Sequence, residues 1–177
     1  MNFAAETRRN GRQIFISPRV GANVTTTTPR PDVVVREASR ADLLSVFRIE
    51  KWSFPQPWPY AAFERFLGEP AFLVAERDGT VVGYVVADSV SNRGTEVGHV
   101  KDIAVHPEHR GEGIGSTLLT RALAVLGANG IDRVKLEVRA ENDEALRLYR
   151  RFGFEPHRVV PAYYDDGEDA YVMVRTP

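Results

Sequence analysis

Cysteine is absent from the 177-residue chain, which excludes disulfide bonds, thiolate metal sites and a cysteine nucleophile. The chain also lacks an excess of either charge, because 23 lysine and arginine residues nearly balance 24 aspartate and glutamate residues. This balance gives no indication of a surface for DNA or for a membrane. No apolar run approaches the roughly 18 residues of a transmembrane helix. The four histidines show no metal-ligand spacing, so no metal site is expected.

Residues 1–32 differ from the rest of the chain in composition. They contain five arginines against two acidic residues, a run of four threonines, and Pro29 and Pro31, with little hydrophobic periodicity. Such a segment favours a flexible basic extension, although a short strand over residues 13–16 or a contact with an acidic partner is also compatible with it. No apolar stretch follows the first arginines, as a secretory signal would require, so a cytoplasmic protein is expected.

Residues 33–177 have the periodicity of one globular α/β domain, and the chain is 43% apolar. Helical spacing predicts one apolar helix face made of Leu43, Leu44, Phe47 and Ile49. The prolines of residues 54–59 must end that helix. The expected order, β-α-α-β-β-β-α-β-α-β-β, indicates helices around a mixed sheet and not a doubly wound nucleotide fold. The elements are expected at residues 33–35, 41–52, 60–67, 71–76, 81–88, 97–105, 113–126, 134–138, 142–153, 154–160 and 170–174.

A glycine-rich turn at residues 110–116, with the sequence R-G-E-G-I-G-S, follows a strand and opens a helix. The free amides of a helix N-terminus bind anions, and glycines let the backbone approach a ligand closely, so pyrophosphate is the expected ligand. Arg110 could add charge-assisted bonds. The spacing fits neither a P-loop nor a dinucleotide-binding turn, because no lysine follows and Ser116 stands three residues after Gly113. A tight turn without a ligand is the alternative.

Two stretches carry a resemblance to a known family. The first is Ile103-Ala104-Val105-His106-Pro107 followed by Arg110-x-x-Gly113-x-Gly115. The second is Leu136-Glu137-Val138-Arg139-Ala140-Glu141-Asn142 followed by Ala145-Leu146-x-Leu148-Tyr149-x-x-Phe152-Gly153-Phe154. They resemble motifs A and B of the GNAT family of N-acetyltransferases. The resemblance implies an α/β fold with a mixed, mostly antiparallel sheet of about seven strands flanked by helices, in a single domain.

The same resemblance implies acetyl-CoA as the cofactor. In the family, the strand of motif A pairs with the pantetheine arm, and the amides of the turn hold the pyrophosphate. The cofactor-binding residues implied for this chain are Ile103, Ala104, Val105, Arg110, Gly111, Glu112, Gly113, Ile114, Gly115, Ser116, Asn142 and Tyr149. Asn142 is also placed as the N-cap of a helix, which is a sufficient reason for its presence.

A narrower resemblance points to the protein N-terminal acetyltransferases, including the bacterial ribosomal-protein alanine acetyltransferase (RimI) and archaeal relatives. It rests on the motif B stretch, on Tyr163-Tyr164-Asp165-Asp166-Gly167-Glu168-Asp169-Ala170-Tyr171, and on Phe54-Pro55. It implies protein N-termini as substrates, ribosomal proteins among them. The residues implied to bind the peptide are Phe54, Pro55, Gln56, Trp58, Tyr163 and Tyr164. Archaeal relatives often carry an acidic residue where this chain has Gln56.

Acetyl transfer to an amine needs a base for the amine and an acid for the departing thiolate. Glu137, on the strand face opposite Leu136, is the candidate base, with a raised pKa expected on a partly covered strand. From the pattern alone, a surface ion pair with Lys135 or Arg139 is the alternative. Tyr149 is the candidate acid that the resemblance implies, and from the pattern alone a core aromatic is the alternative. His99 is assigned no catalytic role.

Two other functions are compatible with parts of this pattern. A small-molecule acetyltransferase acting on a polyamine or an aminoglycoside would favour an acid-rich pocket, which residues 54–59 do not supply. A noncatalytic acyl-CoA sensor would not need both Glu137 and Tyr149. The sequence therefore predicts a protein Nα-acetyltransferase first.

Overall fold

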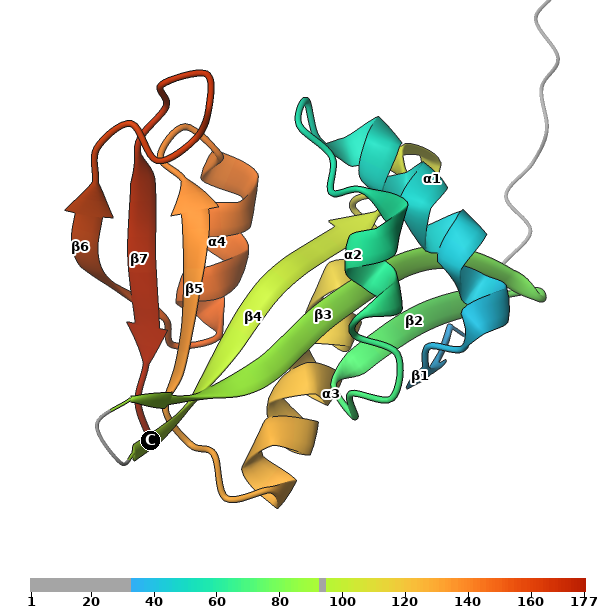
Figure 1. Cartoon of the computed structure of the whole chain (residues 1–177), viewed down its shortest axis with the longest axis horizontal. Coiled ribbons are helices and arrows are strands. Elements are labelled where there is room, and N and C mark those ends of the chain that lie inside the picture. The colour runs from blue at the N-terminus through green and yellow to red at the C-terminus, as the bar shows by residue number, and fades with distance from the viewer. Residues whose placement is uncertain (1–32, 93–94) are drawn as a thin grey trace, which may run out of the picture. The chain divides into compact units, whose positions relative to one another are not determined.

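A single mixed sheet organises the part of the chain that the computed structural model describes, residues 33–92 and 95–177 (Figure 1). The strand order is β1-β2-β3-β4-β5-β7-β6, and β4 with β5 is the parallel pair among antiparallel neighbours. The strands are β1 (Val34–Glu37), β2 (Phe72–Arg77), β3 (Thr80–Asn92), β4 (Thr95–Val105), β5 (Val134–Arg139), β6 (Glu155–Val160) and β7 (Ala170–Arg175). This confirms the expected fold class.

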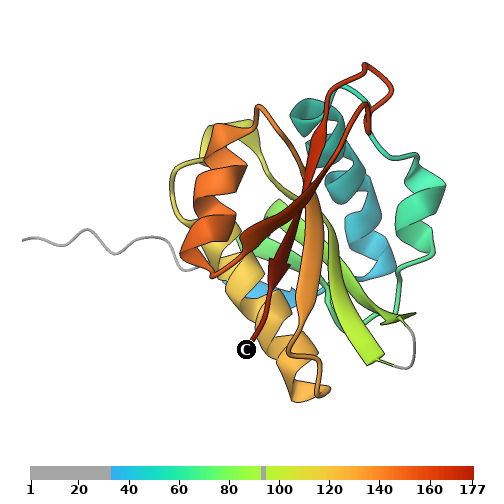
Figure 2. The same ribbon diagram turned by 90° about the vertical axis from the view of Figure 1, so that its left-hand side faces the viewer.

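Helices cover both faces of the sheet (Figures 1 and 2). Helices α1 (Leu43–Ser53) and α2 (Tyr60–Glu64) lie on one face, and α3 (Ile114–Ala128) and α4 (Asp143–Arg151) lie on the other. Each layer has its own buried apolar cluster against the sheet. Short 3₁₀ turns stand at Arg40–Asp42 and Pro107–His109. In the described part of the chain, no helix is both long enough and apolar enough to cross a membrane.

The order of elements predicted from periodicity is confirmed, with differences in detail, among them that β3 continues to Asn92, beyond its expected end at residue 88. The apolar face of α1 was partly misplaced, because Leu44 is 52% exposed while Val46 and Glu50 are buried. Helix α2 ends at Glu64, earlier than expected. The expectations for residues 1–32, including the strand at residues 13–16, lie outside the described residues. The boundary between this segment and the domain stays a prediction.

Strand β4 carries one extra residue in its middle. Consecutive residues of β3 lie opposite Asp102 and Val100, so Lys101 has no opposite residue and forms a β-bulge. A bulge places two successive side chains on one face of the sheet. The Lys101 ammonium accordingly lies 5.9 Å from the centre of the Phe66 ring, and Asp102 bonds to Tyr84. Both contacts are in the layer of α1 and α2.

The parallel strands β4 and β5 separate at this bulge. Their ladder joins residues Gly98–Val100 to Val134–Leu136, and no further pair joins the two strands in the described residues. Both strands nevertheless continue, β4 to Val105 and β5 to Arg139. The backbone of residues 101–105 therefore has an edge that β5 does not occupy, and this edge includes Ile103, Ala104 and Val105, to which the family resemblance assigned the cofactor arm.

Candidate active site

The glycine turn has the backbone geometry that an anion site requires. Gly111 and Gly113 have φ angles of +78° and +86°, and α3 begins at the next residue, Ile114. A Cβ atom added at either glycine would meet no atom within 4 Å. The first amides of α3 have no partner inside the helix, because its first i to i−4 bond runs from Thr117 to Gly113. The turn therefore presents free N–H groups to open space and fits a pyrophosphate.

The charged side chains of this turn are bonded to the protein. The Arg110 guanidinium donates to the carbonyl oxygen of Val105 at 3.1 Å and to the Ser53 hydroxyl at 3.1 Å. Glu112 accepts from Arg77, which lowers the pKa of the Glu112 carboxyl. Arg77 thereby compensates an acidic side chain that stands within the glycine turn. Arg110 links the turn to the end of α1, so the donors that the turn presents in this arrangement are its backbone amides.

Glu137 projects from β5 into a network of donors. Burial alone would raise the pKa of its carboxyl, but His99 at 2.6 Å and Lys135 at 3.2 Å outweigh burial and lower it to about 2. The expectation of a raised pKa was therefore wrong, because two nitrogen donors stabilise the charged form. The pairing with Lys135 that the pattern left open does exist. The predicted side of the strand is confirmed, since Leu136 and Val138 are buried on the opposite face.

His99 is the residue that the sequence reasoning missed at this site. It lies opposite Lys135 in the β4–β5 ladder, and its Nε2 reaches the Glu137 carboxylate. Its Nδ1 lies 3.4 Å from the ammonium of Lys101, which can only donate, so the network places the ring proton on Nε2. Alternation along β4 could have shown which way His99 points, but its partner is 38 residues away.

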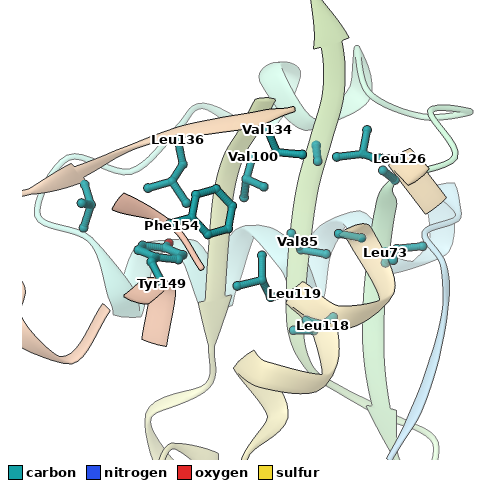
Figure 3. Close-up of a cluster of buried hydrophobic side chains, with 14 of the residues drawn as sticks. Leu73, Val85, Val100, Leu118, Leu119, Leu126, Val134, Leu136, Tyr149 and Phe154 are labelled. Carbon is teal, nitrogen blue, oxygen red and sulfur yellow. The ribbon is translucent and has the colours of Figure 1, made fainter. Parts of the chain in front are cut away.

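Tyr149 lies on α4, facing the sheet from the opposite layer (Figure 3). It is 6% exposed, and its ring meets the edge of Phe154 with centres 5.9 Å apart. Burial, with the charges of Asp102 and Tyr164, raises the pKa of its hydroxyl above the ordinary value. The hydroxyl therefore keeps its proton and can act only as a donor or neutral acceptor. The predicted N-cap of α4 is confirmed, because Asn142 accepts the backbone N–H of Ala145 at 3.0 Å.

The loop between β6 and β7 brings two tyrosines toward Glu137. Burial and the Glu137 charge raise the pKa of Tyr163, and burial raises that of Tyr164 to about 12. The Arg139 guanidinium lies 3.9 Å from the centre of the Tyr164 ring and bonds to Glu168 at 2.5 Å. Arg139 also bonds to Asp166 at 2.8 Å. Strand β5 thus carries Glu137 and also fixes the loop beside it.

The loop between α1 and α2 stands at the same end of the sheet as the β6–β7 loop (Figures 1 and 2). Pro55 and Gln56 are exposed, whereas Phe54 and Trp58 are half-buried. The Trp58 ring stacks on Phe66 with centres 5.8 Å apart, so part of it belongs to the core of this layer. The structure therefore brings Tyr163 and Tyr164 near Glu137, and Tyr149 near Tyr164 from the opposite layer, while the α1–α2 loop stands at the same end of the sheet.

The chain is similar to known acetyltransferases in sequence and in structure. The sequence profile of the acetyltransferase (GNAT) family matches residues 42–154. An N-alpha-acetyltransferase of Sulfurisphaera tokodaii is 38% identical over 150 residues, covering 78% of this chain and 90% of that protein. N-alpha-acetyltransferase RimI of Mycobacterium tuberculosis is 38% identical over 148 residues, covering 81% and 92%. The crystal structure of Ard1 from Thermoplasma volcanium has a TM-score of 0.76 at 32% identity, covering 81% and 96%.

Proposed function

The chain belongs to the GNAT family of acetyltransferases, and we propose that it acetylates the free α-amino group of protein N-termini. Family membership makes it an acetyl-CoA-dependent N-acetyltransferase. N-terminal substrates are supported by the names of both relatives, and by the aromatic loop that Arg139 holds beside Glu137. A relative from Bacillus subtilis, described as a putative ribosomal protein bS18-alanine N-acetyltransferase and 35% identical over 147 residues, supports ribosomal proteins as one class of substrate. Acetyl-CoA, when bound, supplies the acetyl group as an activated thioester.

The observation that carries the mechanism is the pair formed by His99 and Glu137. Because His99 and Lys135 lower the pKa of Glu137, its carboxylate within this network is a poor acceptor for the proton of an α-ammonium group, whose pKa is about 8. An imidazole accepts a proton far better at neutral pH. We therefore extend the role predicted for Glu137: it holds Nε2–H of His99, and Nδ1, once Lys101 has released it, takes the amine proton directly or through one water. Glu137 stabilises the imidazolium that results.

The substrate class can be tested with three acceptors at neutral pH. A peptide with a free N-terminus is expected to be acetylated, and the same peptide with a blocked N-terminus and one internal lysine far more slowly. The lysine ammonium, with a pKa of about 10.4, is harder to deprotonate than the α-ammonium. A polyamine serves as the third acceptor. Equal or faster turnover of the blocked peptide or of the polyamine, measured as CoA release, would contradict the proposal.

The phosphate turn can be tested at Gly113. Replacing Gly113 by valine is expected to weaken acetyl-CoA binding about 10- to 100-fold, the effect of losing a hydrogen bond or two to a charged group. Valine is strained at a φ of +86°, and its side chain would occupy the space in front of the amides. Calorimetry measures the affinity. The matched control is Gly130→Val at the other end of α3, where φ is +75° and the Cβ also meets open space. Equal losses in both variants would remove the phosphate site.

A further inference from the structure

Three side chains that the acetyl-transfer mechanism leaves unused form a hydrogen-bonded chain beneath residues 54–59, in which Glu50 and Tyr84 are buried and Asp102 is half-buried. Glu50 on α1 is 1% exposed, and Tyr84 on β3 is fully buried. The Tyr84 hydroxyl contacts the Glu50 carboxyl and lies 2.9 Å from Oδ2 of Asp102. The other oxygen of Glu50 accepts the backbone N–H of Trp58 at 2.6 Å. One phenol group therefore bridges two carboxyl groups, and one of these holds the α1–α2 loop.

The contacts of Tyr84 with Glu50 and Asp102 determine how many protons these three side chains hold. The Tyr84 hydroxyl has one proton, so it can donate to only one of the two carboxyl groups. If both carboxyls were ionised, the second contact would set a buried carboxylate against an oxygen with no proton between them. One additional proton removes this conflict, because the protonated carboxyl then donates to Tyr84. Burial raises the pKa of Asp102 well above its usual range and raises that of Glu50, which is the direction this count requires.

We propose that Glu50, Tyr84 and Asp102 share a single proton, and that this proton couples the position of residues 54–59 to the charge on Asp102. With the proton on Asp102, Glu50 is ionised and binds the Trp58 N–H more strongly. With the proton on Glu50, Asp102 is ionised where β4 and β5 separate. The two states interconvert when the carboxyl proton passes to the Tyr84 oxygen while the Tyr84 proton passes to the other carboxylate, so no further reactant is needed.

The cations near these residues are bonded to other carboxylates in the described structure. Lys101, beside Asp102 in sequence, bonds to Asp88 at 3.2 Å. On the same side of β4 and β5, His99 and Lys135 are both bound to Glu137. From the opposite layer, Tyr149 is close enough for the charge of Asp102 to contribute to its raised pKa. The shared proton is thus the compensation for the charge of the buried Glu50 and the half-buried Asp102.

This inference rests on the proposed function only in one respect, which is the role of residues 54–59 in binding the peptide. Glu50 is fully covered and acts through Trp58, so it is a positioning residue. Asp102 lies at the start of the unpaired edge of β4. The proton count itself depends on the fold alone and can be measured without any substrate.

The proton count is tested with Glu50→Gln and Asp102→Asn. Each amide can donate to Tyr84 without an additional proton, so each variant is expected to take up one proton fewer than the wild type on folding. A group whose pKa is raised by folding stabilises the fold below that pKa. Above the ordinary carboxyl pKa of about 4, the wild-type unfolding constant should therefore rise with pH up to about tenfold per pH unit more steeply than either variant's.

The slope of the unfolding constant against pH is measured by urea unfolding of the full chain at a series of pH values, without ligand. Equal slopes in the wild type and both single variants would overturn the shared proton. A slope that disappears only in the double variant would mean that each carboxyl holds a proton of its own, and would also overturn it.

The coupling to the loop is tested by the peptide KM from pH 6 to pH 10. Once the shared proton is lost, both carboxyls are ionised at one phenol and repel each other, so Glu50 is expected to move away from the Trp58 N–H and the wild-type peptide KM to rise about tenfold, the cost of one broken hydrogen bond. Glu50→Gln and Asp102→Asn need no shared proton and should lack this rise, while the acetyl-CoA KM stays constant in all three proteins. The same rise in all three would overturn the coupling. If the wild type acetylates no peptide, the proposed function fails while the unfolding slopes still decide the proton count.

Discussion

Replacing Glu137 by glutamine is expected to lower kcat by about 10²–10⁴, the usual contribution of general acid–base catalysis. The amide is neutral, so it cannot stabilise a protonated His99. Its NH₂ group can also face the N–H donors of Lys135 or His99, with which it forms no hydrogen bond. The defect should shrink as pH rises past the α-amine pKa of about 8, because the substrate then arrives already deprotonated. Steady-state rates from pH 6 to pH 10 measure both effects. Near wild-type kcat at pH 7 would remove Glu137 from the mechanism.

The variant His99→Asn distinguishes a base formed by His99 and Glu137 together from Glu137 acting as the base by itself. If the two residues act as one base, His99→Asn should lose about as much kcat as Glu137→Gln, and the double variant should lose little more. If Glu137 accepts the proton by itself, His99→Asn should retain most of the activity. Both single variants should keep the affinity for acetyl-CoA, because neither side chain belongs to the phosphate turn.

Replacing Tyr149 by phenylalanine is expected to lower kcat by about 10²–10⁴ as well, because the leaving thiolate loses its proton donor. Phenylalanine preserves the contact with Phe154 and removes only the hydroxyl. Burial raises the pKa of Tyr149, so the wild type should show no loss of activity from deprotonation of this group up to about pH 10, the ordinary tyrosine value. The measurement is kcat with saturating acetyl-CoA.

The matched control for this variant is Tyr171→Phe on β7, which removes another hydroxyl from the same apolar cluster. It should leave kcat within about twofold, as an ordinary substitution away from the reacting groups does. A similar loss in both variants would indicate a general packing defect. An unchanged kcat in Tyr149→Phe would assign the proton to another donor or to water.

Local signals in the sequence predicted most of this architecture. Alternating residues of β5 placed Glu137 on the correct face, and the glycine turn at the start of α3 was visible from its composition and position. What failed depended on partners far along the chain. The pKa of Glu137 was expected to rise because His99 was not known to reach it from the neighbouring strand.

Glu50 shows the same limit in a helix. Spacing alone favours an apolar residue at a covered position, and a glutamate there reads as exposed. Its burial is explained by Tyr84, 34 residues later, and by the Trp58 backbone N–H in the loop that follows the helix. The hydrogen-bond partners that allow a buried glutamate come together only in the folded chain, so hydrophobic periodicity cannot reveal them.

The β4–β5 ladder ends at Val100, next to the extra residue Lys101. The opening between these two strands therefore depends on the number of residues in β4. Shortening β4 by that residue would restore strict alternation, with Asp102 still on the side of Tyr84, and would give β5 a regular edge to pair with beyond Leu136. The opening between β4 and β5 would then close. Among descendants of this sequence, an indel at this position would therefore be far less tolerated than many substitutions around it.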